Sequence, residues 1–374
     1  MTQTQMEARS ETPAAEAPAA QAKTGAGAVA IRPFEAGVPA PIPREVLSMT
    51  RNLHPERRFW PGKPATDSPG PARDDESVSV ERTIRILLQT TTPGGPDDWS
   101  VESLSLLAGH LASLREDGTR FEVTARNRES VSGGDDPVLR SLDRSSFDEL
   151  WLFALDTGDG LTPSDCMGIT RFRQRGGGIL AARDHQDMGI SLCTLGGIGA
   201  AHHFQTRNPE PDPARLTSDD RETPSISWPN YHSGNNGDFH RIARAEPSHP
   251  LLRNPDSASG WIEFFPAHPH EGAVDAPPGE EARVVATGTS LATGRPFNLA
   301  VAFESREDDH GNRLGRGVAE SSFHHFADYN WDTSRGAPSF VTEPEGQGMR
   351  NEPRALTDIK RYVRNLVFWL APAP

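Results

Sequence analysis

The stretch FDELWLFALDTGDGLTPSDCMGITRFRQRGGGILAARDHQD, residues 147–187, decides the fold class of this chain. It opens with an apolar run, FDELWLFALD, that is hydrophobic enough for a strand covered on both faces. A helix is expected next, with Thr162 as its N-cap, Pro163 in its first turn and the glycines 176–178 at its end. GILAAR then predicts another buried strand. Strand, helix and strand at this spacing indicate a parallel α/β sheet.

The segments on either side extend this pattern. TIRILLQTT (83–91) and FEVTAR (121–126) predict two more buried strands, with an amphipathic helix between them. GWIEFFPAH (260–268) and GRGVAESSFHHF (315–326) also predict strands, and ARVVATGTS (282–290) with FNLAVAFES (297–305) predicts a hairpin-like pair. Apolar residues at helical spacing predict a closing helix over 354–370.

The first eighty residues differ in composition from the rest. Residues 1–30 are low-complexity Ala, Pro, Glu and Thr, which bury too little apolar surface to offset the entropy of ordering, so a disordered tail is expected. Residues 31–81 contain more apolar side chains and are expected to form an extended arm and linker. Such an arm is a candidate contact for a homo-oligomer.

Composition and charge exclude several classes of protein. The net charge of −14 argues against a nucleic-acid partner, because phosphate binding requires clustered Lys and Arg. Only Cys166 and Cys193 are present, which excludes a disulfide framework and a cysteine-rich zinc site. No stretch approaches the ~20 apolar residues of a membrane span, and the N-terminus lacks a secretory signal pattern. A cytoplasmic protein without a membrane partner is expected.

Four motifs in order resemble one known family. They are residues 147–187, the SHPLLRN segment from Ser248, the glycine pair around Arg316, and the closing helix. Together they resemble the ThuA-like (trehalose utilisation) branch of the class I glutamine-amidotransferase-like superfamily. The resemblance implies a flavodoxin-like three-layer α/β/α sandwich with a mostly parallel sheet over residues 82–372. It also implies a link to sugar metabolism.

One departure from that superfamily concerns the nucleophile. Amidotransferases carry a cysteine in a tight elbow after the strand that follows the GGG turn, whereas this chain reads AARDHQDMG at 181–189. Asp184 or His185 occupies the tip of the expected elbow. A thiolate mechanism has no nucleophile there, so the chain is not expected to be a glutamine amidotransferase.

Ligands of open α/β sheets bind beyond the carboxyl ends of the strands, and polar side chains gather at two such ends. RDHQD (183–187) offers Asp184 with His185 as a catalytic pair, and FHHFADYNWD (323–332) offers Asp328 with His325. In each pair the carboxylate would orient an imidazole that acts as general base. The residues expected to contact the substrate are Arg183, Asp187, Tyr231, Asn235, Tyr329, Asn330 and Trp331.

A metal-assisted site is the alternative to metal-free acid-base chemistry. Two or three of five histidines would hold the ion together with an Asp, since His with Asp is a ligand set for Zn²⁺, Fe²⁺ or Mn²⁺. They are His203, His232 and His240 as metal ligands, and His185 and His325 as either general bases or ligands. No H-x-H, H-E-x-x-H or facial-triad spacing stands out among these histidines. No nucleotide cofactor is expected, because the glycine run ends a helix and does not form a P-loop.

Two functions from different classes follow from these observations. The first is an enzyme, a hydrolase or lyase, acting on a small polar substrate, for which the resemblance suggests a sugar-derived molecule. The second is a non-catalytic binding or assembly protein that keeps the amidotransferase-like scaffold without its cysteine.

Overall fold

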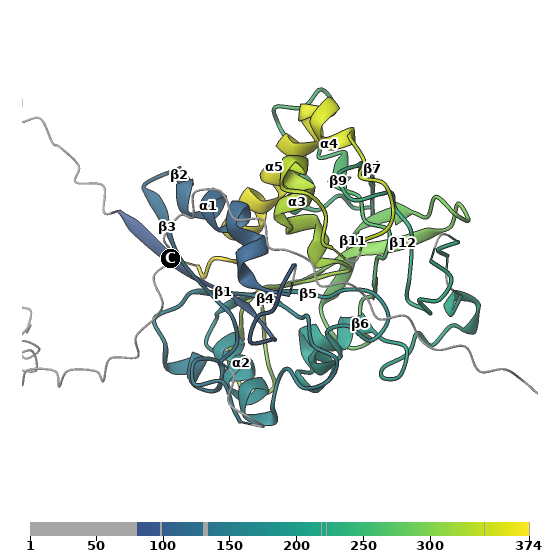
Figure 1. Cartoon of the computed structure of the whole chain (residues 1–374). Coiled ribbons are helices and arrows are strands. Elements are labelled where there is room, and N and C mark those ends of the chain that lie inside the picture. The colour runs from purple at the N-terminus through teal and green to yellow at the C-terminus, as the bar shows by residue number, and fades with distance from the viewer. Residues whose placement is uncertain are drawn as a thin grey trace, which may run out of the picture. The chain divides into compact units, whose positions relative to one another are not determined.

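A run of parallel strands forms the centre of the molecule, as the ribbon of this computed structural model shows (Figure 1). The structure describes residues 81–97, 99–129, 134–217, 219–221, 223–339 and 341–373. The expected tail, residues 1–30, lies outside these ranges, as does the expected arm apart from residue 81. The oligomer contact expected of that arm lies outside them as well.

The central sheet has the strand order β2-β3-β1-β4-β5-β15-β12-β11-β8 within the described residues. Its strands are β1 Arg82–Thr90, β2 Arg115–Glu116, β3 Thr119–Arg126, β4 Glu149–Phe153, β5 Gly178–Ala182, β8 Ala243–Arg244, β11 Ala282–Thr289, β12 Pro296–Phe303 and β15 Gly317–Glu320. The strands β3, β1, β4, β5 and β15 are mutually parallel. In chain order they lie as 2-1-3-4-5, which is the flavodoxin arrangement. The predicted flavodoxin-like α/β fold is therefore confirmed, with antiparallel strands added at both edges.

Helices cover the two faces of the sheet (Figure 1). The helices α1 Ser105–Ser113 and α5 Pro353–Leu370 lie on one face, and α2 Pro163–Gln174 lies on the other. Along β1, Ile86 and Leu88 join the core under α1 and α5, while Leu87 between them joins the core under α2. This alternation follows from the two-residue period of a strand and gives the predicted three layers.

The helix α2 begins as its sequence predicts. The Thr162 hydroxyl accepts a hydrogen bond from the Asp165 backbone N–H at 3.2 Å, and the Asp165 carboxylate accepts one from the Thr162 N–H at 3.1 Å. This reciprocal capping box, with Pro163 in the first turn, satisfies N–H groups that a helix otherwise leaves unpaired.

The segment between β5 and β11 forms short, separate ladders. The strand β6 His202–His203 pairs with β10 Ala273–Val274, and β7 Phe239–Arg241 pairs with β9 Phe264–Pro266. The strand predicted over 260–268 is thus wrong in extent, because only β9 is in a ladder and that ladder lies outside the central sheet.

The strand predicted over 315–326 is also shorter than expected. The strand β15 ends at Glu320, and Phe323–Phe326 forms a 3-10 turn. The Ser322 hydroxyl caps this turn by accepting a hydrogen bond from the His324 N–H at 3.2 Å. A serine that bonds its neighbouring backbone in this way favours a turn over a continued ladder.

Smaller elements complete the described chain. They are the strands β13 Arg306–Glu307 and β14 Arg313–Leu314, the helices α3 Asp328–Trp331 and α4 Gly348–Asn351, and 3-10 turns at Val101–Leu104, Leu139–Arg144, Ile190–Thr194, Gly197–Ala201, Pro213–Arg215, Pro250–Leu252 and Thr333–Arg335. Among the described residues, no helix combines the length and apolar character that crossing a bilayer requires.

Replacing Thr162 by Ala should lower the free energy of unfolding by about 1 kcal/mol, because α2 loses its N-cap acceptor. Thr162→Ser keeps the hydroxyl and should stay within a few tenths of a kcal/mol of the wild type. Urea unfolding of the three proteins measures both changes. Equal losses in the two variants would contradict a capping role for the hydroxyl.

A pH-dependent stability is expected from Glu149, which lies fully buried in β4 and accepts a hydrogen bond from the Trp151 Nε1–H at 2.8 Å. Burial raises the pKa of Glu149 well above its ordinary value of 4.5. The folded state therefore holds this proton more tightly than the unfolded state does, and the wild type loses stability as the pH rises above about 4.5.

Glu149→Gln keeps an acceptor for Trp151 and cannot ionise. Its stability relative to the wild type should rise between about pH 5 and pH 8, which chemical unfolding at several pH values measures. A difference between the two proteins that stays constant over this range would mean that Glu149 is not neutral in the folded state.

Candidate metal and acid-base site

Three segments that are distant in sequence meet beyond the carboxyl ends of β5 and β15. The two strands pair in parallel with Ala182 opposite Glu320, and the Phe323 N–H donates to the Arg183 carbonyl at 2.7 Å. The loop 267–272 lies against both strand ends. A Cβ on Gly272 would stand 2.6 Å from the carbonyl oxygens of Asp184 and Ser321, so only glycine allows this close approach.

Asp184 lies at the centre of a cluster of imidazoles. Its Oδ1 atom accepts a hydrogen bond from His185 Nδ1 at 2.9 Å, and it lies 3.3 Å from His324 Nε2 and 3.8 Å from His268 Nε2. One ligand atom each of Asp184, His268 and His324 fall within 4.8 Å of one another. We call these three residues the rim site.

Both imidazoles of the rim site are held through their Nδ1 atoms. His268 Nδ1 lies 2.9 Å from Asn236 Oδ1, and His324 Nδ1 hydrogen-bonds the Tyr329 hydroxyl. These Nδ1 contacts orient both rings so that their Nε2 atoms face Asp184. Metal-binding histidines are oriented by the same kind of outer hydrogen bond.

The charges in the rim site suit a cation. Burial by itself would raise the pKa of Asp184, but the neighbouring His185 and His324 hold it well below its usual range. Burial, with His324 alongside, lowers the pKa of His268 well below the usual range for histidine. At neutral pH the site therefore offers an ionised carboxylate and a neutral imidazole, which are the forms that bind metal ions.

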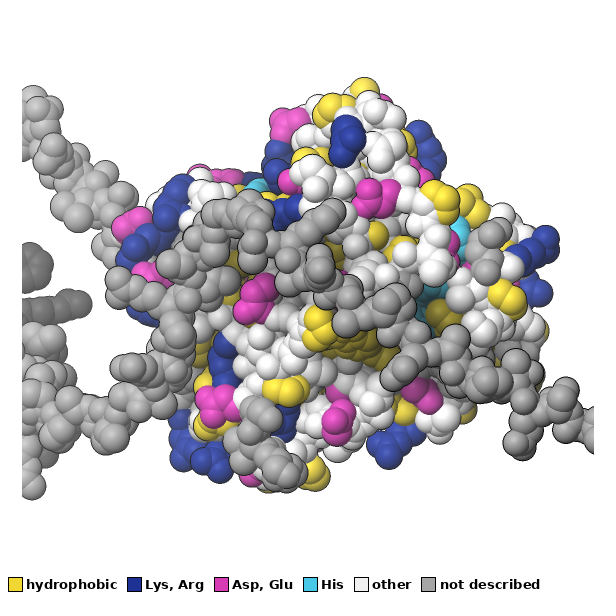
Figure 2. Space-filling model, viewed as in Figure 1, with side chains coloured by type: hydrophobic (Ala, Val, Ile, Leu, Met, Phe, Trp, Pro, Cys, Tyr) yellow, Lys and Arg dark blue, Asp and Glu magenta, His cyan; other side chains and the backbone are white. Residues whose placement is uncertain are grey.

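One side of the rim site reaches solvent. Asp184, His268 and His324 are only 3–6% exposed, whereas the His185 and His270 side chains are 21% and 14% exposed and their rings lie 5.3 Å apart. In Figure 2 histidine side chains reach the surface on the part of the molecule that carries β11 and β12. These two partly exposed rings form the side of the cluster that is nearest to solvent.

Three of the expected substrate contacts instead support the two histidines that precede them. Tyr329 bonds His324 Nδ1, the Asn330 side-chain amide donates to the His324 carbonyl at 2.9 Å, and Trp331 Nε1 donates to the His325 carbonyl at 2.9 Å. Asn330 Oδ1 also accepts from the Gly237 N–H at 2.8 Å. The polar stretch after β15 thus serves to position His324 and His325.

The expected pairing of Asp328 with His325 does not form. The Asp328 carboxylate accepts hydrogen bonds from the Ser105 hydroxyl at 2.6 Å and the Leu106 N–H at 2.8 Å, and it pairs with Arg335 at 2.7 Å. Asp328 therefore fixes α3 to the start of α1, and Glu271 takes the place beside His325 at 3.2 Å.

Arg183 points away from the rim site into the protein. Its guanidinium is fully buried, donates to the carbonyls of His203 and Gln186, and stacks 3.9 Å from the centre of the Phe204 ring. Burial lowers the pKa of Arg183 to about 9. This side chain ties the loop after β5 to β6.

The other expected residues lie around the site in several settings. The Asp187 carboxylate accepts from the Thr206 N–H at 3.0 Å, and the Asn235 amide donates to the Pro344 carbonyl at 3.0 Å. The Tyr231 ring stacks on Phe297, and its hydroxyl accepts from Trp228 Nε1 at 3.2 Å. These contacts join loops to one another.

The three expected metal ligands are not brought together. His203 Nδ1 hydrogen-bonds the Asn208 carbonyl at 2.9 Å, and His232 is buried with neither ring nitrogen hydrogen-bonded. Only His240 joins a group with metal-binding geometry, together with Glu271 and His325.

His268, His270 and Glu271 are not among the residues that the sequence pattern predicts for the site. They form the run HPHE at 268–271, at the end of a segment whose apolar pattern predicts only a strand. The run contains an H-x-H spacing, and it was the signal that could have located the site. Its link to Asp184 and His324 could not be read from the sequence, because the loop carrying it folds back over strands that are far away in the chain.

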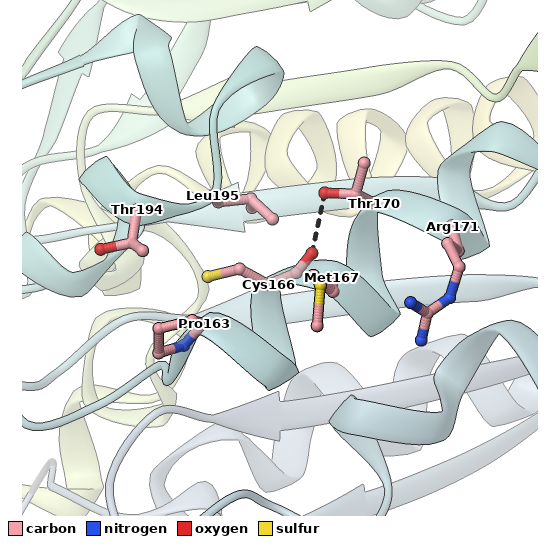
Figure 3. Close-up of a pocket in the computed structure, with 7 residues that line it drawn as sticks. All are labelled: Pro163, Cys166, Met167, Thr170, Arg171, Thr194 and Leu195. Atoms are coloured by element: carbon pink, nitrogen blue, oxygen red, sulfur yellow. Dashed lines mark hydrogen bonds between the residues drawn. The ribbon is translucent and has the colours of Figure 1, made fainter.

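Neither cysteine is placed to act as a nucleophile. Cys166 lines a pocket of about 370 Å³ between α2 and the turn 190–194, with Met167, Thr170 and Leu195 among its neighbours (Figure 3). Burial raises the pKa of Cys166 to about 12, and it also raises that of Cys193. Both sulfurs remain thiols at neutral pH, so this pocket does not offer thiolate chemistry.

Comparisons with known proteins give low similarity. No family model matches the chain, and no curated protein is similar to it. Among solved structures, the glutaminase domain of Trypanosoma brucei CTPS with bound acivicin matches with a TM-score of 0.37 and 13% identity, covering 75% of this chain and 94% of that one. A ThuA-like protein from Parabacteroides merdae matches with a TM-score of 0.35 and 14% identity, covering 71% and 96%. Scores this low carry no argument about chemistry, so the site rests on its own geometry.

Asn330→Ala should lower the free energy of unfolding by about 2–3 kcal/mol, because it leaves the Gly237 N–H and the His324 carbonyl buried without their partner. Asn235→Ala removes one amide bond at a more exposed position and should cost no more than about 1 kcal/mol. Urea unfolding measures both. Similar losses in the two variants would contradict the supporting role assigned to Asn330.

Proposed function

We propose that this protein is a metal-dependent enzyme, a hydrolase or lyase, that acts on a small polar substrate at the rim site. Asp184, His268 and His324 would hold Zn²⁺, Fe²⁺ or Mn²⁺, and His185 would exchange a proton with the substrate. The observation that carries the proposal is the convergence of two imidazole Nε2 atoms on the ionised Asp184 carboxylate.

The ligand set suits a catalytic ion. Two imidazoles and one carboxylate leave coordination positions free for water and substrate, as in catalytic zinc and non-haem iron sites. The partial exposure of His185 and His270 places the accessible side of the site next to these positions. A bound ion would supply a Lewis acid and an activated water.

His185 is suited to a proton-transfer role. Asp184 Oδ1 accepts its Nδ1–H, which fixes the ring and leaves Nε2 as the nitrogen that can take up a proton. A carboxylate that orients an imidazole is the usual arrangement for a general base. A ring that is partly exposed can meet a substrate without rearrangement of the loop.

The substrate proposed is a small polar molecule, and a sugar-derived one follows only from the motif resemblance. The groups around His185 and His270 are imidazoles, carboxylates and amides, including Gln186 and Asn230. Such groups hydrogen-bond hydroxyl-rich molecules well and offer little apolar surface to a hydrophobic ligand.

The test uses the full chain, stripped with a chelator and reloaded separately with Zn²⁺, Mn²⁺ or Fe²⁺. Asp184→Asn and His324→Ala should each bind about one equivalent of metal fewer per chain than the wild type, by elemental analysis. Hydrolysis of 4-nitrophenyl acetate and of 4-nitrophenyl glycosides serves as the activity probe, with an expected loss of about 100-fold or more in both variants.

Two further variants separate the roles. His185→Ala should keep the metal and lose turnover, because His185 is proposed to move a proton and not to bind the ion. Asp187→Asn is the matched control for metal binding, since this carboxylate lies on the same loop and bonds the Thr206 N–H. If Asp184→Asn binds as much metal as the wild type, the rim site is wrong. Metal binding without turnover of any probe would favour the non-catalytic binding or assembly function.

A further inference from the structure

We propose that His240, Glu271 and His325 form a second metal site, closed to solvent, in which Zn²⁺ would cross-link the segment between β5 and β11 to the end of β15. This inference is independent of the function proposed for the rim site. We call these three residues the inner site.

The ligand atoms of the inner site already converge. One atom each of His240, Glu271 and His325 fall within 4.8 Å of one another. Glu271 and His325 are completely buried and His240 is 7% exposed. Two imidazoles and a carboxylate match the ligand preference of Zn²⁺.

Among the described residues, His240 has no hydrogen-bond partner that would explain its burial. Neither of its ring nitrogens bonds to any of them, although the side chain lies in the interior, where the ring stacks on Phe297 and its centre is 6.4 Å from that of His325. Burying an imidazole without a hydrogen bond is unfavourable. Burial also keeps the ring neutral by lowering its pKa to about 4, so a lone pair is available.

Glu271 is held in one orientation from two sides. Its Oε1 atom accepts a hydrogen bond from the Ser233 hydroxyl at 2.8 Å, and its Oε2 atom accepts one from the Ser321 hydroxyl at 3.1 Å. The backbone of Glu271 is fixed as well, by reciprocal hydrogen bonds with Tyr231. A carboxylate fixed in this way is preorganised for a ligand.

His325 has a carboxylate behind it, as metal-bound histidines commonly do. Its Nε2 atom lies 3.2 Å from Glu271 Oε1, and on the other side of the ring Nδ1 lies 3.6 Å from Glu320 Oε2. The Tyr362 hydroxyl donates to Glu320 Oε1 and holds that carboxylate in place. The ring is thus oriented so that Nε2 is directed toward Glu271.

Binding of an ion would raise the charge of the inner site by one unit, because Zn²⁺ brings two positive charges and one proton leaves. Without an ion, the imidazolium of His325 lies between Glu271 and Glu320, which raise its pKa to about 9 in spite of its burial. Binding of Zn²⁺ would replace the proton on Nε2, which leaves to solvent, and would give His240 the partner it lacks.

The position of the inner site indicates a structural role. His240 lies on β7, which pairs only with the short strand β9 among the described strands, and Glu271 lies in the loop before β10. Such short ladders provide few backbone hydrogen bonds. A closed ion between them and the end of β15 would stabilise the loop that also carries His268 of the rim site.

The experiment measures zinc stoichiometry and thermal unfolding of the full chain after chelation and reloading with ZnSO₄. The wild type should bind about two equivalents per chain, and His240→Ala about one, because the rim site remains. The increase in Tm that Zn²⁺ produces should shrink in His240→Ala and persist in Asp184→Asn. His232→Ala is the matched control, since His232 is also buried without hydrogen bonds but belongs to neither site.

The outcomes for the two sites are distinct. The inner site is overturned if His240→Ala binds as much zinc as the wild type, or if His232→Ala loses as much zinc as His240→Ala does. Neither result contradicts the rim site. If zinc is lost only in Asp184→Asn, the inner site is likewise overturned. If only His240→Ala loses zinc, the inner site is supported and the proposed rim site is contradicted.

A second variant covers the case in which His240→Ala does not fold. Glu271→Gln keeps an oxygen for one of the two serine hydroxyls and offers an N–H to the other, while it removes the charge that favours a metal ion. It should bind about one equivalent of zinc fewer than the wild type, and undiminished binding would overturn the inner site.

Discussion

The site depends on the parallel pairing of β5 with β15. This pairing sets Ala182 opposite Glu320 and brings the residues after each strand to the same edge of the sheet. Asp184 and His324, which are far apart in the sequence, therefore come within 3.3 Å. Gly272 completes the arrangement, because the absence of a side chain lets the HPHE loop lie against both strand ends. Every proposed ligand except His240, which lies on β7, reaches its place through one of these three segments.

Buried ionisable groups are the main energetic constraint on this architecture. A charge taken out of water is tolerated only with a partner, and most of these groups have one: Arg183 has carbonyls and the Phe204 ring, and Glu271 has two serines and His325. His240 differs from these groups, because its ring is neutral and has no hydrogen-bond partner among the described residues. An unsatisfied group of this kind indicates either strain or a missing ligand, and its convergence with Glu271 and His325 favours a ligand.

The two proposed sites differ mainly in access. The rim site has His185 and His270 at its partly exposed edge, whereas the inner site is enclosed by β7, the loop before β10 and Tyr362 of α5. Catalytic metal sites keep a position open for substrate, and structural sites do not. The adjacent residues His324 and His325 would thus serve different proposed sites, and the Asn330 and Trp331 side chains donate hydrogen bonds to their carbonyls.

The sequence alone determined the layered α/β fold, because strand and helix periodicity, the Thr162 cap and the glycine run are local signals that do not depend on distant residues. It also placed Asp184 and His185 at a strand end. The tertiary structure decided which side chains share the site. The Asp328 carboxylate bonds α1, and Tyr329 and Asn330 hydrogen-bond His324. His268 and Glu271 come from an irregular loop. Spacing along the chain carries no information on such contacts, since they depend on how a long segment without periodic pattern folds back over the sheet.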